Sequence, residues 1–202
     1  MRIRIDLKIL LFFIIFYFTN QIKIYLIIML FCAIHELGHI IMGLILKMKP
    51  EKIEIMSCGL SVSFYMNPND KNFKIKEIFV ALAGPLTSLA LTILCRFVDL
   101  RFITMQEAVY SNILILFFNL MPLYPLDGGR IIKGILQLKV GSVQSEIITQ
   151  KVSNITIIVL TILCSIFVYY FKNIAIFLIC IFLWGIVIRE KSEKTLDILQ
   201  GK

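Results

Sequence analysis

The stretch Cys32-Ala33-Ile34-His35-Glu36-Leu37-Gly38-His39 lies in the middle of an apolar run that covers residues 24–46. Two histidines four positions apart on a helix project from the same face, one turn apart, and can bind one zinc ion together. At about 1.5 Å of rise per residue, His35 lies about 16 Å from either end of this run. The chain contains no other histidine. The pattern predicts a metal site deep within a membrane-spanning helix.

A single histidine is more often an ordinary core or surface residue than a ligand. Here two histidines flank a glutamate in hydrocarbon, where a charged residue costs roughly 2.5 to 3.5 kcal/mol, so a functional site is the default interpretation. Glu36 follows the first histidine, where the HExxH spacing keeps the carboxylate that activates a metal-bound water. The spacing therefore predicts Glu36 as a general base.

The composition is that of an integral membrane protein. Of 202 residues, 59% are hydrophobic and 17% charged, and the mean hydropathy is +0.89. This length allows one domain. The net charge of +8 does not indicate nucleic-acid binding, because the basic residues are scattered between apolar runs instead of forming one patch.

The apolar runs predict an all-α polytopic fold of about six transmembrane helices, at residues 7–18, 24–46, 78–98, 109–120, 147–171 and 174–188. Residues 53–55 and 60–64 alternate apolar and polar side chains around Cys58-Gly59, which predicts a short membrane-associated β-hairpin between the second and third helices. Such a hairpin could hold an unwound substrate segment by strand addition, or could be a simple re-entrant plug.

The basic residues indicate the orientation in the membrane. With the N-terminus in the cytosol, all but four of the 21 lysines and arginines fall on cytosolic segments; the exceptions are Lys23, Arg96, Arg101 and Lys172. This bias agrees with the positive-inside rule for an even number of spans. We expect a multi-pass protein of the cell membrane with both termini in the cytosol.

Two histidines leave a catalytic zinc ion short of its usual three protein ligands. Asp127 is the best candidate for the third, because it is a lone carboxylate after a long apolar stretch, on a backbone broken by prolines and glycines. The alternative is that Asp127 is the N-cap of a helix over residues 130–138. Cys32, three residues before His35, is a possible fourth ligand.

Three motifs in order carry a family resemblance: HELGH at residues 35–39, AGP at 83–85 and NLMPLYPLDGGR at 119–130. Together they resemble the site-2 protease family of intramembrane zinc metalloproteases, peptidase family M50, and in particular its bacterial branch that includes stage IV sporulation protein FB. The resemblance implies His35, His39 and Asp127 as ligands of one zinc ion per chain and Glu36 as the catalytic glutamate. It implies that Asn119 positions the scissile segment or stabilises the oxyanion. Ser88 stands where that branch has an asparagine.

The sporulation branch tends to carry a CBS domain after its last span, but the length of this chain leads us to expect a single metalloprotease core domain over residues 1–202, without a PDZ or CBS domain. Its substrate would be a membrane-tethered protein, such as a sigma-factor precursor in sporulation or an anti-sigma factor, cut in regulated intramembrane proteolysis. Besides the lipid bilayer, the expected partners are regulatory membrane proteins, and no nucleic acid is expected.

Three other functions remain open. A membrane transporter or channel with a structural or transported metal also uses ligands at mid-membrane, but no internal repeat accompanies these motifs. An inactive homologue could act as a binding platform. CAAX-type membrane metalloproteases share HExxH, but the Leu126-Asp127-Gly128 motif argues against them.

Overall fold

The computed structural model describes residues 2–5, 13–14, 16–18, 20–56, 59–65, 72–97, 102–171, 184–185 and 188. The chain divides into two compact units, Met1–Leu120 and Met121–Lys202. The first contains strands β1 (Arg2–Ile5), β2 (Pro50–Met56) and β3 (Gly59–Phe64) and helices α2 (Ile22–Ile45), α3 (Phe73–Leu94) and α4 (Met105–Asn119). The second contains α5 (Asp127–Val140) and α6 (Ser142–Phe171).

Helix α2 has one face of buried residues on an otherwise apolar surface. From Ile27 onward its residues recur about every three or four positions. The buried residues are Tyr25, Ile27, Phe31, His35, Gly38, His39 and Gly43. It packs against α3, α4 and β3. Small residues let the helices approach closely, as is usual for helix pairs in membranes: a Cβ on Gly38 would meet Thr87 of α3, and one on Gly43 would meet the ring of Phe64.

Helices α2 and α4 begin at the same end of the first unit. Lys23 in the first turn of α2 forms an ion pair of 2.8 Å with Glu107 in the first turn of α4. Glu107 and Thr104 also form a capping box, which satisfies backbone donors at the start of α4. Beyond this pair, Ile27 and Phe31 of α2 pack in one apolar cluster with Ala108, Val109 and Ile115 of α4. The two helices therefore run in the same direction from the Lys23–Glu107 pair.

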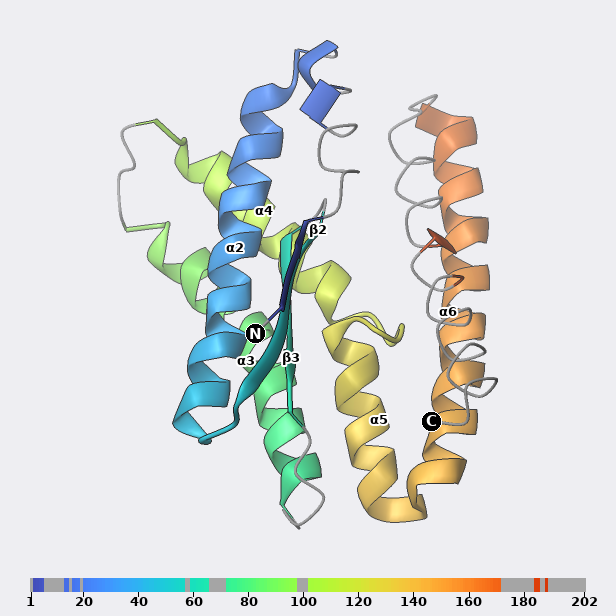
Figure 1. The fold of residues 1–202 in the computed structure, drawn as a ribbon. Helices are drawn as coiled ribbons and strands as arrows, with labels where there is room; N and C mark the ends of the chain where they lie inside the picture. The colour runs from blue at the N-terminus through green and yellow to red at the C-terminus, as the bar shows by residue number, and fades with distance from the viewer. Residues whose placement is uncertain are drawn as a thin grey trace. The chain divides into compact units, whose positions relative to one another are not determined.

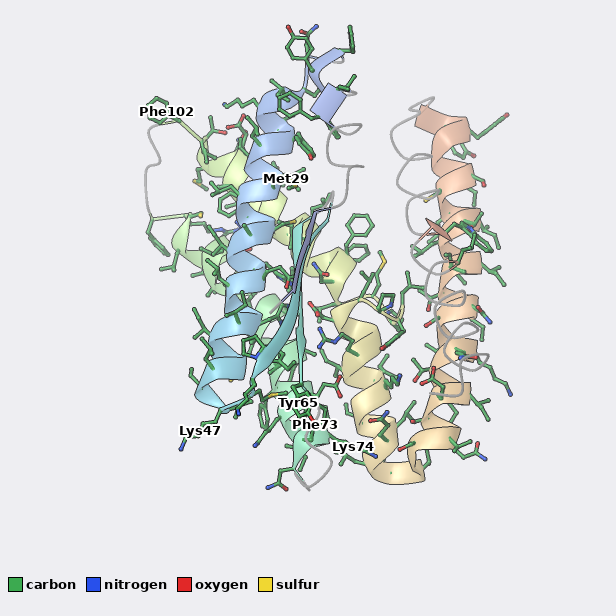
Figure 2. The ribbon with its side chains drawn as sticks, in the orientation of Figure 1. Met29, Lys47, Tyr65, Phe73, Lys74 and Phe102 are labelled. Carbon is green, nitrogen blue, oxygen red and sulfur yellow. The ribbon has the colours of Figure 1, made fainter. Side chains whose placement is uncertain are left out.

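The opposite end of this unit is basic. Lys47 and Lys74, with Tyr65 and Phe73, lie at the end where α2 stops and α3 starts, whereas Phe102 lies at the other end (Figure 2). Lysines at one end of a helix pair suit a membrane boundary.

A three-stranded sheet flanks α2, in the order β1-β2-β3 (Figure 1). Strands β2 and β3 pair antiparallel where the alternating sequence predicted a hairpin, with Ile53 opposite Val62. Strand β1 was not expected; it pairs in parallel with β2, with Arg2 opposite Lys52. Parallel neighbours require a crossover connection, and α2 lies within the connection between β1 and β2.

The second unit is a helical hairpin preceded by a folded loop. Gly141 joins α5 to α6 with a φ of 83°, a left-handed conformation that glycine adopts without steric cost. The two helices pack against each other, and Lys133 of α5 forms an ion pair of 2.7 Å with Glu146 of α6.

The fold is predominantly helical, and three helices of the described part of the chain are long and apolar enough to cross a membrane: α2, α3 and residues 142–166 of α6. Helix α4 coincides with the expected fourth span, but its 15 residues rise only about 22 Å against a hydrocarbon core of about 30 Å. The expected spans at 7–18 and 174–188 lie mostly outside the described residues. The structure therefore supports three spans and leaves the count of six as a prediction.

Candidate metal centre

His35 and His39 face the same point within the first unit. Both are buried, with 2% and 3% of their surface exposed. Their Nε2 atoms lie 3.3 Å apart, and the rings are nearly perpendicular at 79°. Two nitrogens bound to one tetrahedral zinc ion at about 2.05 Å lie about 3.3 Å from each other. The pair thus has the spacing of two ligands of one zinc ion.

The other ring nitrogens are held by α3. His39 Nδ1 lies 2.6 Å from the carbonyl oxygen of Val80. A carbonyl oxygen can only accept, so His39 Nδ1 carries the hydrogen and the neutral ring presents the lone pair of Nε2. His35 Nδ1 lies 2.8 Å from the hydroxyl of Ser88. Such contacts on the second nitrogen fix the tautomer and ring orientation of metal-binding histidines.

Gly84 leaves the space between the two rings open. A Cβ at this position would contact His39 Nε2 directly and would lie 2.6 Å from His35 Nε2. No side chain larger than hydrogen fits there without displacing the rings. The helix continues through the next residue, Pro85. The Ala83-Gly84-Pro85 motif therefore provides a cradle at the point that both Nε2 atoms face.

Glu36 is half-buried on α2, next to His35 and one turn before His39. Positions three apart on a helix are neighbours on its surface, so Glu36 and His39 share one side of α2. A carboxylate beside paired Nε2 atoms can accept and donate a proton where a hydrolytic reaction needs one.

Two asparagines lie on the inward side of α4. Asn112 is completely buried, and its Nδ2 donates to the carbonyl of Ala108 at 2.9 Å. Asn119, the last residue of α4, donates from Nδ2 to the carbonyl of Ile115 at 3.0 Å. A primary amide has two hydrogens, so this bond occupies only one of the two Nδ2 hydrogens of Asn119.

Asp127 belongs to the second unit, where it is the first residue of α5 and is buried, with 5% of its surface exposed. The N-cap position is Leu126, and no side chain caps this helix. The alternative role of Asp127 as an N-cap is therefore wrong, and α5 begins three residues earlier than the expected helix. The guanidinium of Arg130 is 3.9 Å from the carboxylate, too far for a close ion pair.

Cys32 is half-buried and packs against the apolar cluster around Phe31. This environment is that of a small apolar core residue. The structure therefore lends no support to Cys32 as a fourth ligand.

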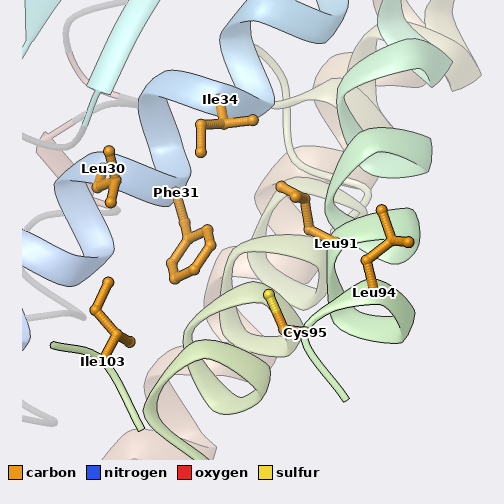
Figure 3. Close-up of a pocket in the computed structure, with 7 residues that line it drawn as sticks. All are labelled: Leu30, Phe31, Ile34, Leu91, Leu94, Cys95 and Ile103. Carbon is orange, nitrogen blue, oxygen red and sulfur yellow. The ribbon is translucent and has the colours of Figure 1, made fainter. Parts of the chain in front are cut away.

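A cavity of about 270 Å³ lies between α2, α3 and the segment before α4 (Figure 3). Its lining is apolar except for one thiol: Leu30, Phe31, Ile34, Leu91, Leu94, Cys95 and Ile103. None of the candidate ligands lines it. No carboxylate or imidazole lines the cavity, so it is separate from the histidine pair.

Sequence reasoning missed the roles of Ser88 and of the Val80 carbonyl. Ser88 was considered only as a replacement for a positioning asparagine, but it contacts His35. The sequence offered one signal for this contact, a serine within the apolar segment 78–98, one turn after the glycine-proline pair. The role of Val80 left no signal, because its backbone carbonyl makes the contact and any residue supplies one.

Comparison with known proteins gives concordant matches. Residues 102–164 match the model of peptidase family M50. Zinc metalloprotease MJ0392 of Methanocaldococcus jannaschii is 32% identical over 166 residues, which cover 72% of this chain and 47% of the relative. Stage IV sporulation protein FB of Bacillus subtilis is 30% identical over 119 residues, 56% of this chain and 40% of the relative. The chain thus spans less than half the length of these two relatives.

A solved structure has the same fold. The site-2 protease from Methanocaldococcus jannaschii superposes with a TM-score of 0.71 over 93% of this chain and 89% of that chain, at 24% sequence identity. At this identity the match shows the fold alone.

Proposed function

We propose that this chain, which carries a peptidase family M50 domain at residues 102–164, is an intramembrane zinc metalloprotease of the site-2 protease type. It hydrolyses a peptide bond within or near the transmembrane segment of a membrane-tethered protein. The observation that carries the proposal is the pair of Nε2 atoms 3.3 Å apart, each ring held through Nδ1 and facing a cradle that only glycine leaves open.

Asp127 completes the ligand set in this proposal. His35, His39 and Asp127 are all buried, and each offers one ligand atom, a ring nitrogen or a carboxylate oxygen. Two imidazoles and one carboxylate form a donor set that zinc enzymes use, with the remaining position open for water or substrate. Asp127 is the first residue of α5 and not its N-cap, which is consistent with this role.

Glu36 acts as the general base and then as the general acid. When bound, zinc would supply Lewis acidity and lower the pKa of a water molecule to about 7. The carboxylate of Glu36 takes the proton from the attacking water and passes it to the leaving amine. The buried setting of the histidine pair excludes bulk water, which strengthens these electrostatic interactions.

Asn119 lies at the depth of the histidines. Helices α2 and α4 run in the same direction from the Lys23–Glu107 ion pair. His35 follows Lys23 on α2 by the same number of residues as Asn119 follows Glu107 on α4. Both residues therefore lie about 18 Å from that pair along their helices. In the proposal, the second Nδ2 hydrogen of Asn119 holds the scissile segment or the developing oxyanion.

The hairpin offers an edge on which an unwound substrate can bind. Among the described strands, β3 pairs on one side only, with β2, and it lies against the histidine-bearing helix. A strand added to that edge is held by main-chain hydrogen bonds and tolerates many side chains. Replacing helix-breaking residues near the substrate's cleavage site by leucine should then slow cleavage strongly, and an unchanged rate would argue against strand addition.

We further propose six spans with both termini in the cytosol. The lysine-bearing end of the first unit, where Lys47 and Lys74 lie, would face the cytosol (Figure 2). The substrate would then be cut on the cytosolic side, as suits a sigma-factor precursor or an anti-sigma factor, and regulatory membrane proteins would control access.

The central test combines metal content with turnover. Purified protein should contain one zinc ion per chain and cleave a single-span candidate substrate. Asp127→Ala should lose the metal and the activity, because it removes a ligand. Glu36→Gln should keep the metal and lose at least about 10²-fold in turnover, the usual cost of a missing general base. Glu107→Gln, an equivalent change remote from the histidines, is the control.

Each failure has a separate meaning. Full zinc occupancy in Asp127→Ala would show that the third ligand is another residue. Near-normal cleavage by Glu36→Gln would refute the proposed chemistry. Zinc bound by a wild-type protein that cleaves no candidate substrate would favour the transporter or the inactive platform.

A further inference from the structure

The loop before α5 is fastened to α6 by two side-chain hydroxyls. The backbone N–H of Tyr124 donates to Ser153 Oγ at 3.0 Å. The hydroxyl of Thr156 shares its single hydrogen between two carbonyl oxygens, that of Val152 on its own helix at 2.9 Å and that of Pro122 at 3.3 Å. Between these two points Leu123 is completely buried. Helix α6 thus supplies one acceptor and one donor to a segment of irregular backbone.

The loop needs such partners because of its sequence. Pro122 and Pro125 have no N–H, so residues 121–126 cannot form a regular helix or strand. Its internal hydrogen bonds join Leu123 N–H to Met121 O at 2.7 Å and Leu126 N–H to Leu123 O at 2.8 Å. Irregular backbone within a membrane is stable only where protein groups satisfy it. Ser153 and Thr156 are two of those groups.

The same loop lies directly on the start of α5. A Cβ on Gly129 would lie 2.5 Å from the carbonyl carbon of Leu123 and would also contact the nitrogen of Tyr124. Lys133 extends over the ring of Tyr124, with its Nζ 4.5 Å from the ring centre, and pairs with Glu146 of α6. The loop is therefore held between α6 and the first two turns of α5, and Asp127 is the next residue after it.

The two hydroxyls belong to a polar stripe on an apolar helix. Ser145, Thr149 and Ser153 are buried at four-residue spacing on α6, and Thr156 continues the stripe. Ser145 bonds to the carbonyl of Ser142 at the start of the helix. Ser153 and Thr156 instead reach the loop, 29 and 34 residues away in sequence. Polar side chains between membrane helices commonly serve as such links.

We propose that Ser153 and Thr156 are positioning residues that set the direction of the Asp127 carboxylate for metal binding. The inference rests on the proposed role of Asp127 as a ligand. Without the hydroxyls, the loop loses its attachment to α6, and the backbone of residues 121–126 relaxes. Groups that orient a ligand typically change metal affinity by about 10- to 100-fold when they are removed.

The test uses the full chain, four single variants on the wild-type background, and Asp127→Ala with and without Ser153→Ala. Ser153→Ala and Thr156→Val remove the hydroxyls singly, and Thr156→Ser keeps the hydroxyl as the conservative rescue. Ser165→Ala is the matched control, because that exposed hydroxyl donates to the carbonyl of Thr161 on its own helix at 2.8 Å. Zinc affinity is measured by competition with a chelator. Hydrogen exchange at residues 121–126 is measured in zinc-free protein, so that one readout does not depend on the metal.

Ser153→Ala and Thr156→Val should each lower zinc affinity by about 10-fold or more and speed exchange in the loop. Thr156→Ser and Ser165→Ala should behave as wild type. On an Asp127→Ala background, Ser153→Ala should change the residual affinity no further, because its effect acts through Asp127.

Unchanged affinity in both single variants would overturn the inference, as would an equal loss in Ser165→Ala or an undiminished effect on the Asp127→Ala background. These results would leave the ligand assignment standing. The assignment itself falls only if Asp127→Ala retains zinc.

Discussion

Gly84→Ala places one methyl group between the two histidines and tests the metal centre most directly. The new Cβ would lie 2.6 Å from His35 Nε2 and would contact His39 Nε2. Ordinary contact with carbon needs about 3.5 Å, so the ring of His35 or α3 must move by roughly 0.9 Å, and the closer ring of His39 by more. Zinc ligands must keep their distances within about 0.2 Å. The displacement therefore exceeds the tolerance of the site several-fold.

We expect Gly84→Ala to lower zinc affinity at least about 100-fold, which corresponds to about 3 kcal/mol. The overpacking itself should cost about 1 to 3 kcal/mol of stability. Zinc per chain is measured by atomic emission after dialysis at controlled free zinc, and thermal unfolding is compared in zinc-free protein. The control is Gly185→Ala, since a Cβ there meets no atom of the described residues within 4 Å. Wild-type zinc affinity in Gly84→Ala would refute the assigned position of the metal.

Three further predictions follow from contacts in the first unit. Ser88→Ala should lower zinc affinity by about 10- to 100-fold while Ser88→Thr retains most of it, because the hydroxyl orients His35; equal affinities in chelator competition would contradict this. The hydrogen bond from Lys23 and the one from the backbone of Thr104 lower the pKa of Glu107. The Lys23–Glu107 pair therefore stabilises the folded protein fully above the ordinary pKa of a glutamate, and this contribution is lost as the pH falls through the lowered pKa. The difference in unfolding temperature between wild type and Glu107→Gln should accordingly shrink on acidification, and a constant difference would count against the pair. In a cysteine-free background, Lys74→Cys should be shielded from impermeant thiol reagents added outside cells, whereas Lys23→Cys should react; the reverse pattern would invert the proposed topology.

The parts of the site that sequence analysis could predict are local. Two histidines at a spacing of four must share a face of any helix, and α2 is helical over its whole apolar run. The partners of the Nδ1 atoms lie 53 and 41 residues away on α3, and no periodicity links them to the histidines. Close packing around Gly38 and Gly84 brings them together, and that packing is a tertiary property.

The sheet likewise has one part that the sequence could predict and one part that it could not. The hairpin of β2 and β3 joins neighbouring residues, and its alternation of apolar and polar side chains is visible in the sequence. Strand β1 has only four residues, two of them arginines, and such a segment reads as the basic flank of a first span. Its partner is specified by long-range parallel pairing, which a four-residue pattern cannot encode. The start of α5 was likewise placed three residues late, because Leu126 carries no capping side chain that would mark it.

The parallel pairing of β1 with β2 also imposes an order on synthesis and folding. Each residue of β1 pairs with one fifty positions later, so the strand emerges from the ribosome long before its partner exists. The β2–β3 hairpin closes a short loop, whereas the pairing of β1 with β2 closes a loop of about fifty residues that contains the histidine-bearing helix, and the longer loop costs more entropy to close. On the entropy of loop closure alone, the hairpin is expected to form before the β1–β2 ladder.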